Sequence, residues 1–224
     1  MGITLSQSEA EKLEAYHKML LEASKVMNLT AITDESEMAD RHYADSLSPL
    51  AQAGLITGGS LIDVGTGAGF PGLPLAIARP DISVTLLDSL KKRLDFLKTV
   101  IDALNITNVT LVHARAEDAA AGELRGKFDI VVARAVAPLP VLLEYTLPFA
   151  AIGGAVIAYK GPSAEEELES AGNALAKLGG GGAKIYDCKI GSHDWQHKLV
   201  YVKKTSDTPR AYPRKAGTPS KTPL

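Results

Sequence analysis

Four glycines stand at close intervals in the segment from Asp63 to Gly72, directly after a short run of apolar residues. Glycine lacks a Cβ atom, so it permits tight turns and lets a ligand come close to the backbone. Pro71 suits the first turn of a helix, because its missing N–H would have no partner there. The pattern predicts a strand, a glycine loop and a helix that bind a cofactor at the carboxyl end of the strand.

Two classes of cofactor fit such a loop. Gly67, Gly69 and Gly72 match the GxGxxG spacing of dinucleotide-binding enzymes, a motif that is weak by itself. Asp63 ends the preceding apolar run, where its carboxylate would repel a pyrophosphate and attract the cationic sulfonium and ammonium groups of S-adenosylmethionine (AdoMet). Asp63 therefore favours AdoMet, with Gly65 and Gly67 in the binding loop, and an NAD-dependent dehydrogenase stays open as the alternative.

Two further acidic residues follow the next predicted strands. Asp88 ends the run 82–88, where a carboxylate can accept hydrogen bonds from both ribose hydroxyls of either cofactor class. Glu117 follows the run 109–114, and with Ala116 it would lie near an adenine ring. The alternative role for Glu117 is structural, because the helix dipole stabilises an acid in the first turn of a helix.

Arg134 lies at the end of the apolar run 128–135, beside the position expected for methyl transfer. A buried guanidinium without a partner would cost several kcal/mol, so this arginine must have one. We expect Arg134 to position the substrate and to contact the cofactor, and a structural ion pair with a nearby acid is the alternative.

Several residue types and motifs are absent from the sequence, and their absence excludes some kinds of site and some methyl acceptors. Cys188 is the only cysteine, which excludes a disulfide and a zinc cluster, and the five histidines form no metal-binding pair, so we expect no metal. A cytosine-C5 enzyme would need a cysteine at the methyl group, and enzymes that methylate exocyclic amines carry an Asn/Asp-Pro-Pro-aromatic loop where this chain reads RAVAPLP (134–140). A ring nitrogen such as guanine N7 needs no general base, so alignment, worth up to about 7–11 kcal/mol, and electrostatics can suffice.

The elements that must position these residues form an alternating pattern. Short apolar runs alternate with helix-like segments, of which 91–104 is the clearest, and repeated βα units predict a mostly parallel sheet covered on both faces. After the glycine run 179–182, two runs without a helix between them predict an antiparallel edge pair. We therefore expect an α/β fold, Rossmann-like, with a mostly parallel seven-stranded sheet; the runs are 61–65, 82–88, 109–114, 128–135, 154–161, 183–190 and 197–204.

Composition places this sheet in one globular domain with short appendages. Hydrophobic residues make up 46% of the 224 and charged residues 22%, and no apolar run reaches the ~20 residues that span a bilayer. We expect a cytoplasmic monomer with a helical extension at 1–57, in which Ser6 and Glu9 form a capping box, and a methyltransferase domain at 58–204. Four prolines in 205–224 argue against a regular helix, so this arm should be extended or disordered.

Charge is distributed unevenly along the chain. The net charge is −2, yet 203–224 holds six basic residues and one acid, so this stretch carries 6 − 1 = +5 and the remainder −7. A basic arm on an acidic body fits an RNA partner, and a solvated tail is the alternative. The basic rim that we expect to contact RNA comprises Arg41, His42, Lys91, Lys92, Arg93, Lys160, Arg210, Arg214 and Lys215.

These motifs together resemble the bacterial 16S rRNA (guanine-N7) methyltransferase G family, also called glucose-inhibited division protein B. The resemblance spans nearly the whole chain, and only the glycine run 179–182 departs from it, which puts the register of the edge strands in doubt. The matching segments are MNLTAIT (27–33), RHYADSL (41–47), DVGTGAGFPGLPLAI (63–77), LLDSLKKRLDFL (86–97), RAED (115–118), ARAVA (133–137), YKG (159–161) and YPRKAGTPSKTPL (212–224).

The resemblance implies a class I AdoMet-dependent methyltransferase that forms 7-methylguanosine in the decoding-region loop of 16S rRNA, either free or in the small ribosomal subunit. It also implies that the AdoMet site is lined by Gly65, Phe70, Asp88, Ser89, Leu90, Ala116, Glu117 and Arg134. A methyltransferase of a small molecule or protein, which would not need the basic arm, and a non-catalytic binding module remain as alternatives.

Overall fold

The computed structural model describes residues 2–27, 39–52, 54–56, 58–190 and 196–224, and only the backbone of residues 39 and 41. The segment 28–33, which carries most of the MNLTAIT match, and the side chain of Arg41 therefore lie outside the described residues. Among the described helices, none combines the length and the apolar character needed to cross a bilayer.

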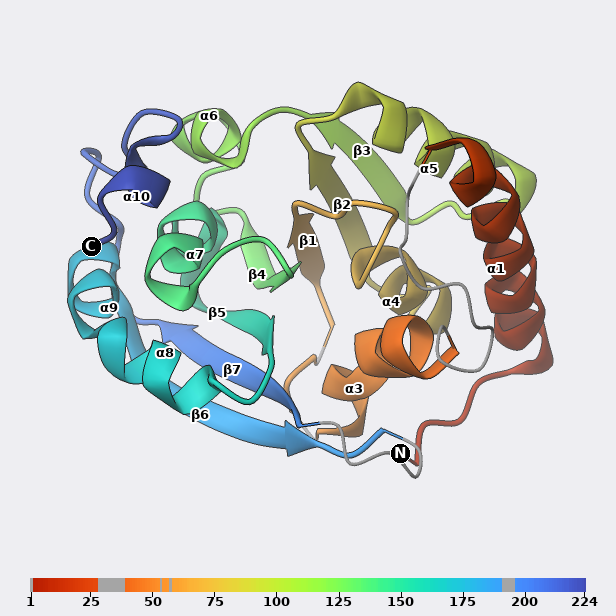
Figure 1. Ribbon diagram of the computed structural model, residues 1–224, viewed down its shortest axis with the longest axis horizontal. Helices are drawn as coiled ribbons and strands as arrows, with labels where there is room; N and C mark the ends of the chain where they lie inside the picture. Colours follow the sequence, from red (N-terminus) through yellow and green to blue (C-terminus); the bar gives the residue numbers. More distant parts are fainter. Residues whose placement is uncertain (1, 28–38, 53, 57, 191–195) are drawn as a thin grey trace.

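A seven-stranded sheet forms the centre of the molecule (Figure 1). Its order is β3-β2-β1-β4-β5-β7-β6; neighbours from β3 to β5 run parallel, and β7 pairs antiparallel with both β5 and β6. This confirms the predicted sheet and its antiparallel edge pair. The strands span Ser60–Val64 (β1), Ser83–Asp88 (β2), Val109–His113 (β3), Phe128–Arg134 (β4), Ala150–Lys160 (β5), Gly180–Cys188 (β6) and His197–Lys204 (β7).

Helices connect the strands and cover both faces of the sheet. Figure 1 places α1, α3, α4 and α5 on one side of the strands, and α6 to α10 on the other. The helical segments span Gln7–Met27 (α1), Ala39–Ala44 (η1, a π-helical turn), Asp45–Ala51 (α3), Gly72–Ala78 (α4), Lys91–Ala103 (α5), Ala116–Ala121 (α6), Leu139–Thr146 (α7), Leu147–Phe149 (η2), Ala164–Ser170 (α8), Gly172–Leu178 (α9) and Thr218–Lys221 (α10).

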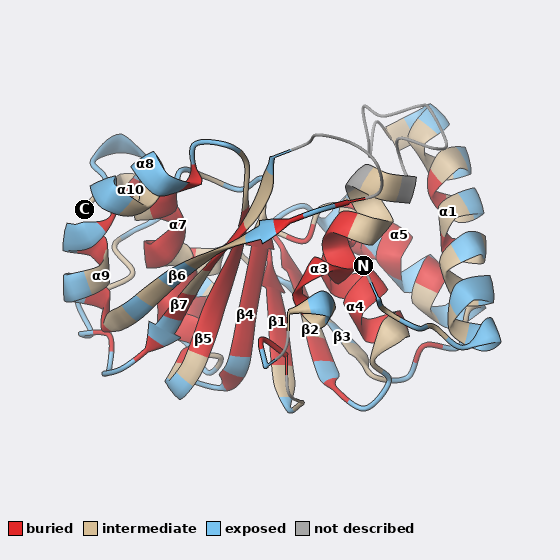
Figure 2. Cartoon of the chain, turned by 90° about the horizontal axis from the view of Figure 1, so that it is seen from below, coloured by how far each residue is buried: buried red, intermediate tan, exposed pale blue. Residues whose placement is uncertain are grey.

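Side chains of each central strand alternate between two hydrophobic cores. Leu61 and Val132 pack with α1, α4 and α5, whereas Ile62 and Val131 pack with α7 and α9. The strands are therefore buried on both faces, as Figure 2 shows, while the helices expose their outer surfaces. From β1 the strand order runs to β2 and β3 on one side and to β4 and β5 on the other. Open α/β sheets bind ligands beyond the carboxyl ends of the strands at the point where the strand order reverses in this way.

The N-terminal helix α1 begins with the predicted capping box. The Ser6 amide donates to Glu9 Oε2 at 2.7 Å, and the Glu9 amide donates to Ser6 Oγ at 3.3 Å. Tyr16 and Leu20 are fully buried against the core, and the Tyr16 hydroxyl donates to the Ala68 carbonyl in the glycine loop at 2.5 Å. Helix α1 thus packs on the core and contacts the glycine loop.

Two expectations need correction. Strand β6 begins at Gly180, inside the glycine run, and not at residue 183. The close packing requires a glycine at this position, because a Cβ atom would come within 3.0 Å of side chains of Leu147, Leu175 and Val202. The arm is neither fully extended nor free of helix: α10 is one helical turn with Pro219 near its start, where the missing N–H has no consequence.

Candidate active site

The glycine loop after β1 adopts a backbone that other residues would strain. Gly65, Gly67 and Gly69 have φ angles of +76°, +62° and +111°. A Cβ atom on Gly65 would lie 2.9 Å from Val136, and one on Gly69 would lie 2.7 Å from both Leu97 and the Tyr16 hydroxyl. The loop is therefore held between Tyr16 of α1, Leu97 of α5 and Val136, as expected for a tight turn, and ligand binding by the loop stays a prediction.

Asp63 lies beneath this loop and is fully buried. Its Oδ2 accepts hydrogen bonds from Thr66 Oγ1 at 2.7 Å and from the Gly72 amide at 2.8 Å. Burial raises the pKa of this carboxyl to about 6, and Oδ1 is buried without a hydrogen-bond partner among the described residues. Asp63 thus ties both ends of the loop together, and direct contact with a methyl donor stays a prediction.

Asp88, at the end of β2, joins the loop to the start of α5. Its Oδ2 accepts from the Gly67 amide at 2.9 Å and from Arg93 Nη1 at 3.3 Å, and its Oδ1 accepts from the Leu90 amide at 2.8 Å. A carboxylate has about four acceptor positions, so one remains for a ligand, and a second becomes available if Arg93 moves.

A cavity of about 290 Å³ opens beyond the ends of β1, β2 and β3. Of the predicted cofactor residues it is lined by Gly65, Asp88, Ser89, Ala116 and Glu117. Its remaining lining residues were not predicted as cofactor contacts: Val64, Leu87, Arg93, Ala114, Arg115, Ala135, Val136 and Tyr145. Arg115 stands beside Ala116 in the RAED motif and could have been included, whereas Tyr145 lies on α7 and carries no sequence signal.

Five predicted cofactor residues do not line this cavity: Asp63, Gly67, Phe70, Leu90 and Arg134. Phe70 belongs instead to an aromatic cluster, in which its ring stacks on His42 at 4.7 Å and on Tyr16 at 5.4 Å. The Arg134 guanidinium lies 5.2 Å from the centre of the same ring. Phe70 therefore connects α1, the RHYADS segment and Arg134 behind the glycine loop.

Arg134 is the centre of a second polar group, at the end of β4. Its Nη1 donates to Asp45 Oδ2 at 2.9 Å, and its Nη2 lies 3.3 Å from His42 Nδ1. The other oxygen of Asp45, which is 5% exposed, lies 2.9 Å from His197 Nδ1. One buried carboxylate thus holds a guanidinium and an imidazole together. The ion pair with a nearby acid, which was the alternative to a functional role for Arg134, is present, and that functional role stays a prediction.

This polar group borders a second cavity, of about 450 Å³, which includes Asp45, Arg134, Lys160 and His197 in its lining. Ala135 lines both cavities, and its φ of +56° is unusual for a residue other than glycine. Strained backbone of this kind is concentrated at functional sites. Both cavities therefore border the residue that follows Arg134.

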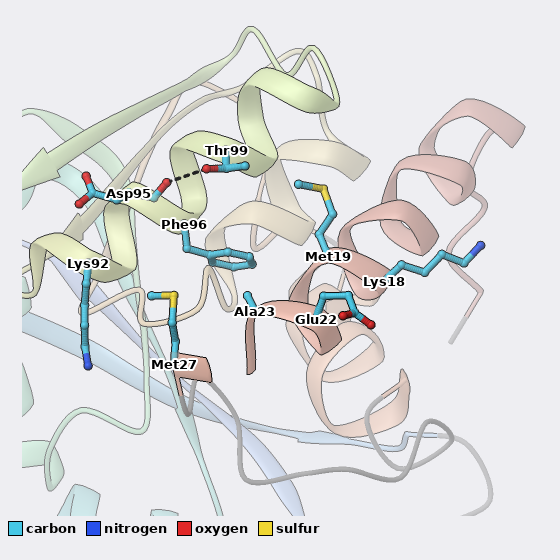
Figure 3. Close-up of a pocket in the computed structure, with 9 residues that line it drawn as sticks. All are labelled: Lys18, Met19, Glu22, Ala23, Met27, Lys92, Asp95, Phe96 and Thr99. Atoms are coloured by element: carbon cyan, nitrogen blue, oxygen red, sulfur yellow. Dashed lines mark hydrogen bonds between the residues drawn. The ribbon is translucent and has the colours of Figure 1, made fainter. Parts of the chain in front are cut away.

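A cavity of about 760 Å³ lies elsewhere, between α1 and α5. Figure 3 shows its apolar floor, formed by Met19, Ala23, Met27 and Phe96, with Lys18, Glu22, Lys92 and Asp95 around it. It contains neither the glycine loop nor the end of a strand, so we do not assign the cofactor to it.

The predicted RNA contacts fall into two groups. Arg210 and Lys215 are exposed, whereas Lys160 binds Glu167 and the Ala137 carbonyl at 2.7 and 2.8 Å. Arg214 is bound to Glu144, Arg93 to Asp88, and His42 lies against Arg134 and Phe70. In the described chain, no group of acidic, cysteine and histidine residues is arranged to hold a metal ion.

Solved structures with a similar architecture include a cofactor-bound protein and a protein in complex with AdoMet. A cofactor-bound protein from MTB matches with a TM-score of 0.58, at 18% identity, over 90% of this chain and 91% of that chain. M. jannaschii TYW2 in complex with AdoMet matches with a TM-score of 0.52, at 17% identity, over 90% of this chain and 77% of that chain. At these identities the likeness establishes the class I methyltransferase fold only.

Sequence relatives are much closer. A protein from Desulfitobacterium hafniense (strain Y51) is 49% identical over 100% of this chain and 93% of its own length, and one from Clostridium beijerinckii is 47% identical over 100% and 94%. Both are named ribosomal RNA small subunit methyltransferase G. Residues 9–196 also match the family model GidB, described as rRNA small subunit methyltransferase G. The chain therefore belongs to the rRNA small subunit methyltransferase G family.

Proposed function

We propose that this protein transfers the methyl group of AdoMet to N7 of a guanine in the decoding-region loop of 16S rRNA, acting in the cytoplasm as a monomer. The observation that carries the proposal is that two cavities with different lining residues share Ala135. A methyl donor in the first and a base in the second would bring the reacting atoms together there. The name shared by the relatives supports a ribosomal RNA substrate.

The groups that line the first cavity are suited to AdoMet. The loop offers backbone at Gly65, Asp88 keeps acceptor capacity for the ribose hydroxyls, and Ala114 and Ala116 leave room for a flat adenine ring. Glu117 adds a second carboxylate, and Asp63 lies behind the loop. The lining holds two acids, Asp88 and Glu117, and two arginines, Arg93 and Arg115, so its charge does not decide between AdoMet and a dinucleotide; membership of the methyltransferase family supports AdoMet.

The second cavity fits a guanine. Arginine is the residue that most often reads guanine through O6 and N7 in nucleic-acid complexes. With N7 turned to the methyl donor, Arg134 would donate to O6, and the bonds to Asp45 and His42 would fix its guanidinium in direction. AdoMet, when bound, supplies the electrophilic methyl group; the protein aligns the N7 lone pair with it and excludes water.

The test is incubation of the protein with labelled AdoMet and small-subunit rRNA, free or assembled, followed by mapping of the modified base. We expect label on N7 of one guanine. Label on a protein or small molecule and none on rRNA would support the alternative methyltransferase, and failure to bind AdoMet would leave only the non-catalytic binding module.

A further inference from the structure

The C-terminal arm, residues 205–224, lies against the same helices that form the cofactor cavity. Arg125, just after α6, donates to the carbonyls of Thr208 at 2.5 Å and of Tyr212 at 2.8 Å. Figure 1 shows α10 beside α6 and α7. Thr208 Oγ1 also donates to the Leu178 carbonyl at 2.7 Å, so the first half of the arm is fastened both by Arg125 and by the end of α9.

Arg214 provides the main anchor of the arm. Its backbone amide and its Nε donate to Glu144 Oε1 at 2.8 and 2.9 Å, and its Nη2 donates to Glu144 Oε2 at 2.6 Å. Glu144 lies on α7 and is 0% exposed. Removing one partner of a buried ion pair leaves an uncompensated charge, so Arg214 and Glu144 hold the arm on α7 as a unit.

From this anchor the arm reaches two residues that line the cofactor cavity. The Gly217 amide donates to Glu117 Oε1 at 3.2 Å, and Ser220 Oγ lies 2.9 Å from the Tyr145 hydroxyl. Gly217 has a φ of +81°, a conformation that glycine adopts without strain, and this lets the chain turn its N–H toward Glu117 just before α10.

We propose that residues 217–220 of the arm position Glu117 and Tyr145 for cofactor binding, so that the affinity for AdoMet depends on the arm. The inference rests on the proposed assignment of this cavity to AdoMet. Glu117 is a carboxylate that is 6% exposed at the start of a six-residue helix, and Gly217 is its hydrogen-bond donor among the described residues. Without that donor the carboxylate is free to rotate toward water, and the cavity loses its ordered wall.

The arm therefore has a role other than the one that its charge indicates. Arg214, expected to contact RNA, is engaged with Glu144, and after it Gly217 and Ser220 contact Glu117 and Tyr145, which line the cofactor cavity. A chain without the arm should be impaired in cofactor binding before any RNA is present. A purely RNA-binding arm would leave the affinity for AdoMet unchanged.

The test uses a chain that ends at Ala216, which keeps the Arg214–Glu144 ion pair and removes the Gly217 amide and Ser220. We expect the Kd for AdoMet, measured by equilibrium dialysis without RNA, to rise about fivefold or more, because a hydrogen bond to a charged group is lost. The matched control is Lys221→Ala, a surface change on α10 that keeps both contacts and should leave the Kd unchanged.

A double-mutant cycle separates positioning from general destabilisation. In a Glu117→Ala, Tyr145→Phe background, the same truncation should leave the Kd for AdoMet unchanged, although it can still lower the melting temperature. A truncated chain with the affinity of the full chain would overturn the inference, as would an equal loss of affinity in both backgrounds. Failure of the full chain itself to bind AdoMet would instead overturn the proposed function.

Discussion

At the scale of the residue, the place of Arg134 in the structure favours a role in positioning the substrate over contact with the cofactor, the two roles expected from the sequence. It lines the second cavity and not the one assigned to AdoMet. We therefore expect Arg134→Ala to lower kcat/KM for rRNA methylation about 100-fold, because a donor aimed at the substrate is lost. The Kd for AdoMet, measured by calorimetry, should stay close to that of the wild type.

The matched variant is Arg134→Lys, which keeps the positive charge but lacks the planar guanidinium. A lysine cannot donate to Asp45 and to the proposed base with the same geometry. It should recover little of the lost activity. Full activity of Arg134→Ala would contradict the role in positioning the base, and a large loss of AdoMet affinity would instead return Arg134 to the cofactor site.

Asp63 makes the stability of the protein depend on pH. Burial raises the pKa of this carboxyl from 3.8 to about 6, so the folded state binds its proton more tightly than the unfolded state does. The stabilisation is complete below pH 4 and is lost as the pH rises through 6, by on the order of 3 kcal/mol. Asp63→Asn, which cannot ionise, should escape this loss.

Urea unfolding of both proteins at several pH values between 4 and 7 measures the effect. The free energy of unfolding of Asp63→Asn, relative to the wild type, should increase steadily across this range. Parallel stability curves would contradict the raised pKa. The comparison cancels the pH dependence of the other groups, which both proteins share.

Single residues were predictable where a loop or strand end determines their place. Gly65 and Asp88 line the cavity assigned to AdoMet because Gly65 directly follows β1 and Asp88 ends β2, and Glu117 lines it from the first turn of α6, the helix that follows β3. Phe70 and Arg134 were not, because their positions depend on His42 and Asp45, which lie on a separate helical segment. Such contacts between distant segments leave no local periodicity in a sequence.

At the scale of the element, α1 supports the glycine loop through Tyr16. The Tyr16 hydroxyl donates to the Ala68 carbonyl, and its ring packs against Phe70 and Tyr43. Tyr16→Phe should lower the free energy of unfolding by about 1–2 kcal/mol, because a buried carbonyl loses its donor. It should also weaken AdoMet binding, since the loop loses its tie to α1.

Urea unfolding and calorimetry with AdoMet check both effects. Tyr186→Phe on β6, the edge strand farthest from β3, is the matched control and should leave the AdoMet affinity unchanged. A Tyr16→Phe protein with wild-type stability and wild-type affinity would show that α1 contributes packing alone.

The helices and strands of the central domain were predictable because their apolar spacing records burial directly. Alternating runs gave the strands, and Leu94 and Leu97 of α5 are buried as their helical spacing indicated. The arm was not predictable in the same way. Its prolines correctly signalled little regular structure, but its fixed path depends on Arg125, Glu144 and Glu117, which lie 70 to 100 positions away.

At the scale of the whole molecule, the charge that remains available for RNA is smaller than the sequence indicates. Arg214 of the basic arm is paired with Glu144, whereas Arg210 and Lys215 are exposed. RNA binding by phosphate contacts releases counterions, so log Kd should vary linearly with log salt, with a slope of about 0.7 per contact.

The double variant Arg210→Ala, Lys215→Ala should therefore lower this slope by about 1.4 if both residues contact phosphates. Binding of small-subunit rRNA measured between low and physiological salt gives the slope. The matched control replaces Lys18 and Lys25, two exposed lysines on α1 that pair with glutamates of their own helix, and should leave the slope unchanged. An unchanged slope in the arm variant would contradict a phosphate-binding role. Both arm substitutions leave the Gly217 and Ser220 contacts in place, so the affinity for AdoMet should be the same in the wild type, the arm variant and the control variant.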